Sequence, residues 1–312
     1  MKANRWGSRA ALILVAALRV ASAAEAQAPG ITRKPPTRAA DWTAVDRIMG
    51  REGKMQPGGV YKYAFPRGDL QVQTHGVTVK PALALGSWVA FEGTSGDAMA
   101  MGDLVLAEGE VTPVITKLQQ MGVQQTALHN HLLGESPRIM YLHIEARSQA
   151  TKIAEAVHAA LALTRTPPAQ PAAAQPNEAF TLDTAQIKAA LGYGGTVNGG
   201  VYQVSIPRAE TIRADGMEIL PSMGVATAIN FEPTVRGKAA ITGDFVLIAN
   251  EVNPVIQALR NSGIEVTAVH SHMLTEEPRL FFLHYWANDD AVTLARGLRK
   301  ALDRMNVKKA AS

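Results

Sequence analysis

The chain contains no cysteine, and this absence excludes several classes of protein at once. Without a thiol there is no disulfide framework, no thiolate metal ligand and no cysteine to carry a lipid. Stability must therefore come from packing. A chain of 312 residues, of which 47% are hydrophobic, is long enough to form one or two domains with substantial cores.

Long apolar runs are also missing. The run Ala10–Leu18 is too short to span a bilayer, which takes about 20 apolar residues. Basic residues precede this run, and Ala21-Ser22-Ala23 follows it as a small-residue cleavage site, so the pattern predicts a signal peptide over residues 1–24. We expect a periplasmic or secreted protein with no membrane span.

The excess of positive charge belongs to this leader. Its basic residues are Lys2, Arg5, Arg9 and Arg19, and it has no acidic residue, so its removal takes the formal net charge of +4 to zero. Binding to a phosphate backbone requires a concentrated cationic face. We therefore expect no nucleic-acid partner.

Histidine is scarce, yet most of the eight histidines stand in two matching blocks. The first block is His129-Asn130-His131, Glu135, Pro137-Arg138 and His143, and the second is His270-Ser271-His272, Glu276, Pro278-Arg279 and His284. Scattered surface histidines would not repeat in this way.

The two blocks are part of an internal repeat that covers almost the whole chain after the leader. Matching pairs outside the blocks include Gly59-Val60-Tyr61 with Gly200-Val201-Tyr202, Phe91-Glu92 with Phe231-Glu232, and Gly102-Asp103 with Gly243-Asp244. We expect repeats over 41–163 and 182–305, joined by a Pro/Ala-rich linker over 164–181. A period this long indicates duplicated domains.

The pattern within each copy predicts an α+β domain with a mostly antiparallel sheet and a β-α-β-β-α C-terminal half, and we expect the copies to be related by a pseudo-two-fold. Helices are expected near 41–50 and 183–191, and a bent strand over Leu70–Val79. Central helices are expected to start at Pro113 and Pro254, after N-caps Thr112 and Asn253, and to end before Gly122 and Gly263. Final helices are expected to be capped by Ser148 and by Asn288 or Asp289.

The histidines lie in a predicted hairpin of strands Val123–Leu132 and Ile139–Ala146. Side chains alternate faces along a strand, so His129 and His131 share one face. A turn centred on Ser136 would place His143 directly opposite His129. A turn centred on Glu277 would pair His270 with His284 in the same way, so each repeat is expected to form a patch of three imidazoles.

Three clustered imidazoles are typical of a site for a divalent metal such as zinc, iron, manganese or copper. Glu135 and Glu276 are candidates for a further metal ligand or for a catalytic acid/base. Arg138 and Arg279 are candidates for ligand binding. The spacing His-x-His-x3-Glu resembles the first metal motif of cupins, although the helix expected just before it does not fit a β jelly roll.

Several alternatives stay open at this point. The histidines could form a structural network with buried carboxylates, with Arg138 and Arg279 as ion-pair partners. The two blocks could make one shared site or two. The protein could be a metal-dependent hydrolase or oxidoreductase, or a non-catalytic module that binds a small molecule or a cell-envelope component. Because both copies keep the whole block, binding is favoured over catalysis.

Two further pairs of charged residues repeat between the copies. Glu110 and Glu251 precede the central helices, where the helix dipole favours negative charge, so capping explains them better than catalysis. Arg67 and Arg208, each after a proline, could bind an anionic ligand or simply mark an exposed strand end.

The runs Met101–Leu106, Glu110–Val114 and Ala127–Leu133, followed by the residues of the first histidine block, resemble the LppY/LpqO family of exported bacterial proteins. The second copy repeats these motifs. The resemblance implies export and a domain of unknown function, and it supplies no reaction. This chain lacks the cysteine through which lipoprotein members are acylated.

Overall fold

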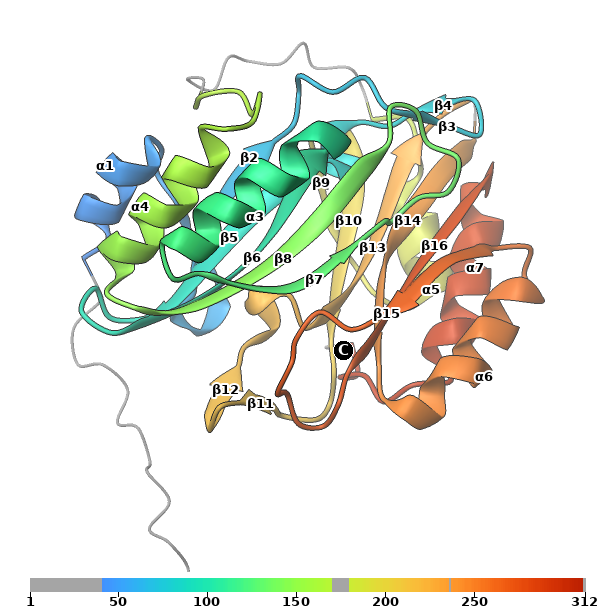
Figure 1. Ribbon diagram of the computed structural model, residues 1–312. Helices are drawn as coiled ribbons and strands as arrows, with labels where there is room; N and C mark the ends of the chain where they lie inside the picture. The colour runs from blue at the N-terminus through green and yellow to red at the C-terminus, as the bar shows by residue number, and fades with distance from the viewer. Residues whose placement is uncertain (1–40, 170–179, 236, 311–312) are drawn as a thin grey trace, which may run out of the picture. The chain divides into compact units, whose positions relative to one another are not determined.

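A computed structural model describes residues 41–169, 180–235 and 237–310. The predicted signal peptide lies outside these residues, as does most of the predicted linker. Both histidine blocks belong to one compact unit that spans 38–312, so contacts between the two repeats are part of this unit. Figure 1 shows the arrangement of its helices and strands.

The first repeat begins with a short helix and continues into a sheet. Its elements are α1 (Thr43–Met49), β1 (Lys54–Met55), η1 (Pro57–Gly59), β2 (Tyr61–Pro66), β3 (Gln73–Thr74), β4 (Val77–Thr78), α2 (Pro81–Ala84), β5 (Gly86–Gly93), β6 (Ala98–Ala107), η2 (Glu108–Glu110), α3 (Val111–Gln120), β7 (Gln124–His129), β8 (Ile139–Ser148) and α4 (Ala150–Leu161). The predicted β-α-β-β-α order is confirmed from β6 to α4.

The strands and long helices of the second repeat follow the same order, with the 3-10 turn η3 in the position of α2 and no counterpart of η1 or η2 among the described residues. Its elements are α5 (Thr184–Leu191), β9 (Thr196–Asn198), β10 (Val201–Pro207), β11 (Ile212–Ala214), β12 (Met217–Ile219), η3 (Pro221–Met223), β13 (Ala226–Pro233), β14 (Lys238–Leu247), α6 (Ala249–Arg260), β15 (Glu265–His270), β16 (Phe281–Asp290) and α7 (Ala291–Leu302).

Each repeat forms one large antiparallel sheet. The strand order is β1-β2-β5-β6-β8-β7 in the first sheet and β15-β16-β14-β13-β10-β9 in the second, so β7 and β15 are edge strands. The prediction of a duplicated α+β domain with mostly antiparallel sheets is therefore confirmed. None of the helices in the described ranges is long and apolar enough to cross a membrane.

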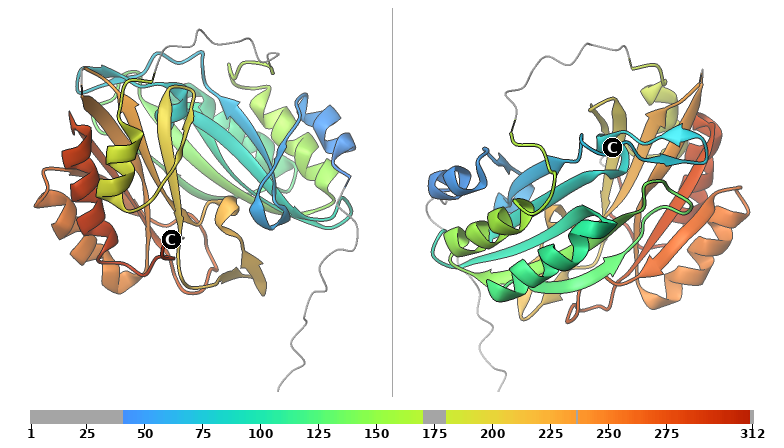
Figure 2. Two further views of the ribbon diagram at one scale, coloured as in Figure 1. Left: turned by 180° about the vertical axis from the view of Figure 1, so that it is seen from behind. Right: turned by 45° about the horizontal axis from the view of Figure 1, so that its top comes forward.

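The two sheets face each other, and helices cover their outer faces (Figures 1 and 2). Strand alternation explains this arrangement, because Leu142 and Ile144 of β8 point into the helix-covered core while Tyr141 and His143 point the other way. Two further apolar clusters join the inner faces across the repeats, with α2 packed on the second sheet and η3 on the first. The histidines lie between these clusters.

The central helices start earlier than predicted. α3 begins at Val111 and α6 at Ala249, so Pro254 lies inside its helix, and the caps predicted at Thr112 and Asn253 are wrong. The Glu251 carboxylate accepts from the backbone N–H of Ile248, the N-cap of α6. The Glu110 carboxylate accepts from the backbone N–H of Ala107, the N-cap of the 3-10 turn η2 that leads into α3.

The same glutamates bind buried arginines. Arg67 and Arg208 are 0% and 2% exposed, and each guanidinium donates to a glutamate at 2.7 Å, to Glu110 and Glu251 respectively. The interpretation of these arginines as exposed strand ends or anion-binding residues is therefore wrong. They are structural cations whose charges are neutralised in the interior, where an unpaired charge would be very costly.

Smaller differences concern two other segments. The strand predicted over Leu70–Val79 is a short hairpin of β3 and β4, because His75 and Gly76 both adopt positive φ. The caps predicted at Ser148 and at Asn288 or Asp289 are displaced to Gln149 and Asp290, since β8 and β16 extend to Ser148 and Asp290.

Candidate functional site

All six histidines of the two blocks meet between the facing sheets. Ring centroids lie 3.6 Å apart for His129 and His270, 3.7 Å for His131 and His284, and 3.6 Å for His143 and His272. Each of these pairs joins one ring from each repeat. The structure therefore brings the two predicted patches together into one cluster, which we call the histidine cluster.

Strand pairing brings a carboxylate beside this cluster in each sheet. On the inner faces, Asp103 of β6 stands directly opposite His143 of β8, and Asp244 of β14 stands directly opposite His284 of β16. The Asp244 Oδ1 atom lies 2.8 Å from Nδ1 of His284, and Asp103 Oδ1 lies 3.9 Å from Nε2 of His143. The His284 N–H points instead toward the carbonyl oxygen of Gly243, at 3.0 Å.

The predicted hairpin register is wrong, but the error does not change which face of the sheet each strand residue occupies. His129 pairs with Tyr141, and His143 pairs with Ala127; in the second repeat His270 pairs with Phe282. The pairing is displaced by two residues from a turn centred on Ser136 or Glu277. A two-residue shift returns every side chain to the same face of the sheet, so the histidines still converge.

His131 and His272 lie beyond the ends of β7 and β15, in the loops. Strand alternation therefore does not place them. Instead their rings stack on aromatic rings of the neighbouring strands, His131 on Tyr141 at 3.3 Å and His272 on Phe282 at 3.6 Å between centroids. These aromatic residues bring both rings back toward the cluster.

Many of the buried nitrogen atoms in the histidine cluster lack a hydrogen-bond partner. Within the described part of the chain, the unpartnered ring atoms are His129 Nε2, His131 Nε2, His143 Nε2, His270 Nδ1 and His284 Nε2. One close approach joins two rings, with Nε2 of His270 2.8 Å from Nε2 of His272. Buried polar atoms are nearly always satisfied, so this concentration of unpartnered nitrogens in one place calls for a physical explanation.

Burial favours the uncharged form of five of the six imidazoles. Desolvation is the main cause that lowers the pKa of His129 to about 4 and the pKa values of His131, His143 and His272 well below the usual 6.5. The pKa of His270 is lowered for the same reason. Neutral imidazoles keep a lone pair free, and a lone pair is what a metal ion needs.

Two groups of nitrogen atoms are close enough to share an ion. One group comprises His129, His270, His272 and His284, and the other comprises His129, His131 and His143, with the ligand atoms of each group within 4.8 Å of one another. His129 belongs to both groups. Its Nδ1 lies 3.3 Å from the carbonyl oxygen of Asn130, which leaves Nε2 for a ligand.

The glutamates predicted as ligands or acid/bases are in neither group. Glu276 is buried, where its carboxylate accepts from the backbone N–H of Leu280 at 2.9 Å and from Arg279 at 3.3 Å. Glu135 accepts from the side chain of Asn130 at 3.3 Å. Both carboxylates therefore hold the loops that carry the histidines.

The arginines predicted to bind a ligand are exposed. Arg279 is half-exposed and donates to the carbonyl oxygens of Met273 and Leu274 as well as to Glu276, so it also supports the loop. Arg138 is exposed on the matching loop. Neither arginine lines the pockets beside the histidine cluster.

Asp103 and Asp244 are the carboxylates that sequence reasoning underestimated. The pKa of Asp103 is raised to about 7, mainly by burial and secondly by the charge of Asp244. Oδ1 of each residue has no hydrogen-bond partner among the described residues. The signal in the sequence was an aspartate in the middle of an apolar strand in both copies.

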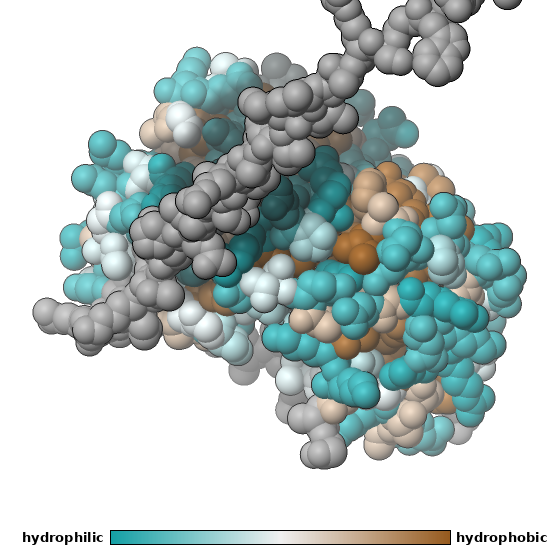
Figure 3. All heavy atoms as spheres, turned by 90° about the horizontal axis from the view of Figure 1, so that it is seen from below, coloured by the Kyte–Doolittle hydropathy of each residue, from teal (hydrophilic) through white to brown (hydrophobic). Residues whose placement is uncertain are grey.

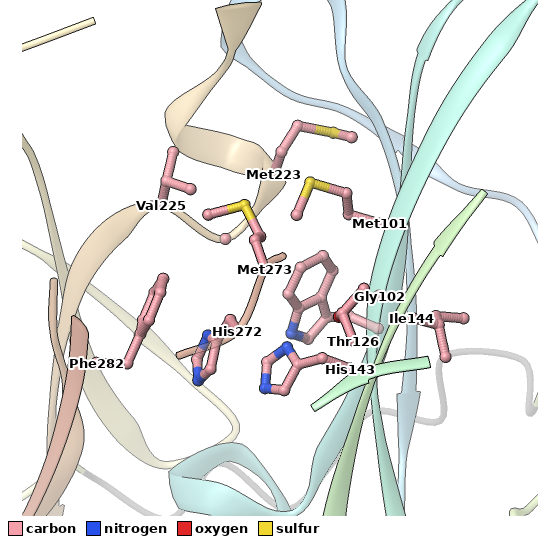
Figure 4. Close-up of a pocket in the computed structure, with 12 residues that line it drawn as sticks. Met101, Gly102, Thr126, His143, Ile144, Met223, Val225, His272, Met273 and Phe282 are labelled. Carbon is pink, nitrogen blue, oxygen red and sulfur yellow. The ribbon is translucent and has the colours of Figure 1, made fainter. Parts of the chain in front are cut away.

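Two adjoining pockets reach this cluster. The smaller, about 10 Å³, lies where the rings of His143 and His272 face each other below Met101, Met223 and Met273 (Figure 4). The larger has a volume of about 250 Å³, and Asp103, Asp244, His143 and His272 line it together with Lys62. The face seen from below carries mostly hydrophilic side chains with smaller hydrophobic groups between them (Figure 3).

Comparison with known proteins gives little beyond the family. No curated protein matches the chain. Solved structures with some similarity include the trimeric bacterial microcompartment shell protein PduB, with 11% identity over 81% of this chain and 90% of that one, at a TM-score of 0.23. EtuB from Clostridium kluyveri has 10% identity over 84% of this chain and 98% of that one, at a TM-score of 0.20. Similarity at these TM-scores carries no information about this chain.

One family model matches both halves of the chain. It covers residues 43–163 and again residues 185–304, which include the two histidine blocks and the elements that position them. The chain therefore belongs to the family described as Domain of Unknown Function (DUF1259), and it carries two tandem copies of that domain.

Proposed function

We propose that this protein binds a divalent metal ion in the histidine cluster, with ligands from both repeats. The observation that carries the proposal is the set of buried ring nitrogens without hydrogen-bond partners among the described residues. A structural network would satisfy these atoms with protein groups, because leaving a buried polar group unpaired costs about 1–3 kcal/mol.

The donor set limits the choice of ion. Imidazole nitrogens suit zinc, copper and iron, whereas manganese prefers oxygen ligands, of which Asp103 and Asp244 are the nearest candidates. His129 offers one free nitrogen and belongs to both possible ligand groups. We therefore infer one shared ion rather than one ion for each repeat.

We also propose that a pseudo-two-fold axis relates the repeats and passes between His129 and His270. These residues match each other in the duplication, and the pair of His131 with His284 maps onto the pair of His272 with His143. The similar centroid distances of the last two pairs, 3.7 and 3.6 Å, support this symmetry.

The place of action is a further proposal. The leader pattern and the resemblance to the LppY/LpqO family favour an exported protein of the bacterial envelope. A test is to express the full chain and determine the N-terminal sequence of the protein recovered from the periplasm. A mature N-terminus between Ser22 and Gly30 is expected, and an intact Met1 in the cytoplasm would contradict export.

The metal proposal is tested by elemental analysis of protein purified without chelators, followed by titration of zinc, copper(II), iron(II) and manganese(II) into metal-free protein. We expect about one ion per chain, lost in the His129→Ala variant. His158→Ala is the matched control, because His158 lies exposed on α4, away from the cluster. Metal-free protein that binds none of these ions would refute the proposal.

Metal-dependent catalysis, hydrolytic or oxidative, is the second candidate function. The observation that favours it is the pocket of about 250 Å³, in which cluster histidines and two carboxylates meet solvent. Asp103, whose pKa of about 7 suits proton transfer at neutral pH, is a better general acid/base in this geometry than Glu135 or Glu276.

A further inference from the structure

The larger pocket is built asymmetrically from the two repeats. Lys62, Trp88 and Asp103 of the first repeat line it together with Ser222, Asp244 and His272 of the second. Apart from the histidine, three of them have ionisable side chains: an ammonium group on Lys62 and carboxyl groups on Asp103 and Asp244. A ligand of this pocket must satisfy both kinds of charge.

A row of side chains crosses the inner face of the first sheet and leads from Lys62 to the histidine cluster. Lys62 lies on β2, Trp88 on β5, Asp103 on β6 and His143 on β8, and both Trp88 and His143 are direct neighbours of Asp103 in the strand pairing. One small molecule that lies along this row would reach from the ammonium group to the proposed metal ligands.

The ammonium group of Lys62 has N–H donors available for a ligand. It donates to the carbonyl oxygen of Ser222 at 3.3 Å and lies 3.7 Å from the centre of the Trp88 ring. An ammonium group has three N–H donors, so this single hydrogen bond leaves donors over. Lys62 forms no ion pair with any residue in the described ranges.

The second repeat has no such group. Gln203 stands where the first repeat has Lys62, and Ala228 stands where it has Trp88. The Gln203 amide donates to the carbonyl oxygen of Ala82 at 2.8 Å, and Asn230 donates to that of Leu83 at 3.3 Å. These bonds hold α2 against the second sheet, so the side with the cation is also the side with the open pocket.

Asp103 and Asp244 determine which other chemical groups a ligand of this pocket needs. Oδ1 of Asp103 and Oδ1 of Asp244 are buried and without a hydrogen-bond partner in the part of the chain that the structure describes. An ionised carboxylate only accepts hydrogen bonds, so both atoms can accept from ligand donors such as hydroxyl groups. A ligand with anionic groups alone would be repelled here.

We propose that this pocket binds a small hydroxy acid, with its carboxylate on Lys62 and its hydroxyl groups facing Asp103 and Asp244. A volume of about 250 Å³ limits the ligand to a few carbon atoms. The contact with the metal rests on the proposed function, whereas the contacts with Lys62 and the aspartates do not.

Three probes of equal carbon number separate the contributions: glycerate has a carboxylate and hydroxyls, propionate only the carboxylate, and glycerol only hydroxyls. Each is titrated into metal-free and zinc-treated protein while the indole N–H signals are followed by NMR, with Trp88→Phe to identify the Trp88 signal. We expect glycerate to bind most tightly and to shift this signal.

The decisive variant is K62Q, because the second repeat shows that glutamine donates to the equivalent carbonyl oxygen. We expect glycerate to bind about 10-fold or more weakly, as for the loss of a hydrogen bond between charged groups, while zinc content stays the same. Gln203→Lys is the matched control and should leave glycerate binding unchanged.

Unchanged glycerate binding in K62Q, or propionate and glycerol binding as tightly as glycerate, would overturn the inference. A failure of the metal proposal looks different. In that case zinc does not bind, and the dependence of glycerate binding on Lys62 persists in the metal-free protein.

Discussion

The two repeats are alike where they hold the fold together and different where they meet the solvent-accessible pocket. Arg67 bonds Glu110 and the backbone of Val105, each at 2.7 Å, and Arg208 bonds Glu251 and the backbone of Val246 at the same distance. The histidines and their neighbouring aspartates repeat as well. The shared residues therefore make the framework and the cluster.

The differences lie around the cluster. Lys62 and Trp88 in the first repeat are replaced by Gln203 and Ala228 in the second, and Tyr141, whose hydroxyl donates to Ala84, is replaced by Phe282. Duplication thus supplies the cluster histidines from both repeats, whereas Lys62 and Trp88 give the pocket a cation and an aromatic ring from the first repeat alone. If a ligand binds on only one side of the cluster, its binding depends on the residues that differ between the repeats.

The largest effect that we expect is the acid sensitivity of the metal-free protein, because the cluster joins the repeats. Imidazoles in the unfolded chain take up protons near pH 6.5, whereas burial lowers the pKa of five histidines in the folded cluster, to about 4 for His129. Stability should therefore fall as the pH drops through this window. Asp103, with a raised pKa, opposes this trend as a single group.

Urea unfolding of metal-free protein at several pH values between 7 and 4 measures this effect. Loss of both repeats in one transition would show that the shared cluster couples them. A free energy of unfolding that does not change across this range would contradict the buried, neutral state of the histidines.

The buried arginines test whether the frameworks of the repeats are equivalent. Arg67→Met removes the cation that pairs with Asp69 and Glu110, and Arg208→Met the one that pairs with Glu210 and Glu251. Breaking a buried ion pair costs about 3–5 kcal/mol. We expect similar losses in both variants, because the side chains of Arg67 and Arg208 are 0% and 1% exposed. Denaturant unfolding measures both, and a loss confined to one repeat would break the comparison.

Metal affinity separates His129 from its counterpart His270. His129 belongs to both possible ligand groups and His270 to only one. We expect His129→Ala to weaken zinc binding by at least about 100-fold, since even residues behind the ligands contribute 10–100-fold, and His270→Ala to weaken it less. Competition titration with a zinc indicator gives both constants. Equal losses would favour a strictly symmetric site.

The two repeats differ in how closely the neighbouring strand approaches the glycine that precedes each aspartate. An added β-carbon at Gly102 would lie 2.8 Å from the Trp88 carbonyl oxygen, and one at Gly243 would lie still closer to the carbonyl oxygen of Ala228. Both alanine variants should destabilise the protein by about 1–3 kcal/mol, as overpacking does, with Gly243→Ala the worse. Thermal melting of both variants checks the order.

The smallest effect concerns the last helix of each repeat. Asp290 caps α7 by accepting from the backbone N–H of Thr293 at 2.8 Å, whereas the Gln149 side chain makes no such bond for α4. Asp290→Ala should cost about 1 kcal/mol, and Gln149→Ala should cost nothing measurable. Equal effects in denaturant unfolding would contradict the cap.

Much of the fold was predictable from patterns within the chain. The duplication, the β-α-β-β-α order and the common face of His129 and His143 follow from repeated motifs and strand alternation. The burial of Arg67 and Arg208 was not, because their bonds to Glu110 and Glu251 join residues far apart in the chain and have no local signal. The hairpin register also depends on loops that no simple turn rule describes.

The sequence by itself determined that six histidines stand in two matching hairpins of a duplicated α+β domain. Only the tertiary structure decided that the hairpins face each other, so that His129 lies 3.6 Å from His270 and two patches become one cluster. It also decided that Asp103, Asp244 and Lys62 adjoin that cluster. Periodicity is local information, whereas the partner of a sheet face is set by which apolar surfaces of both repeats are buried together.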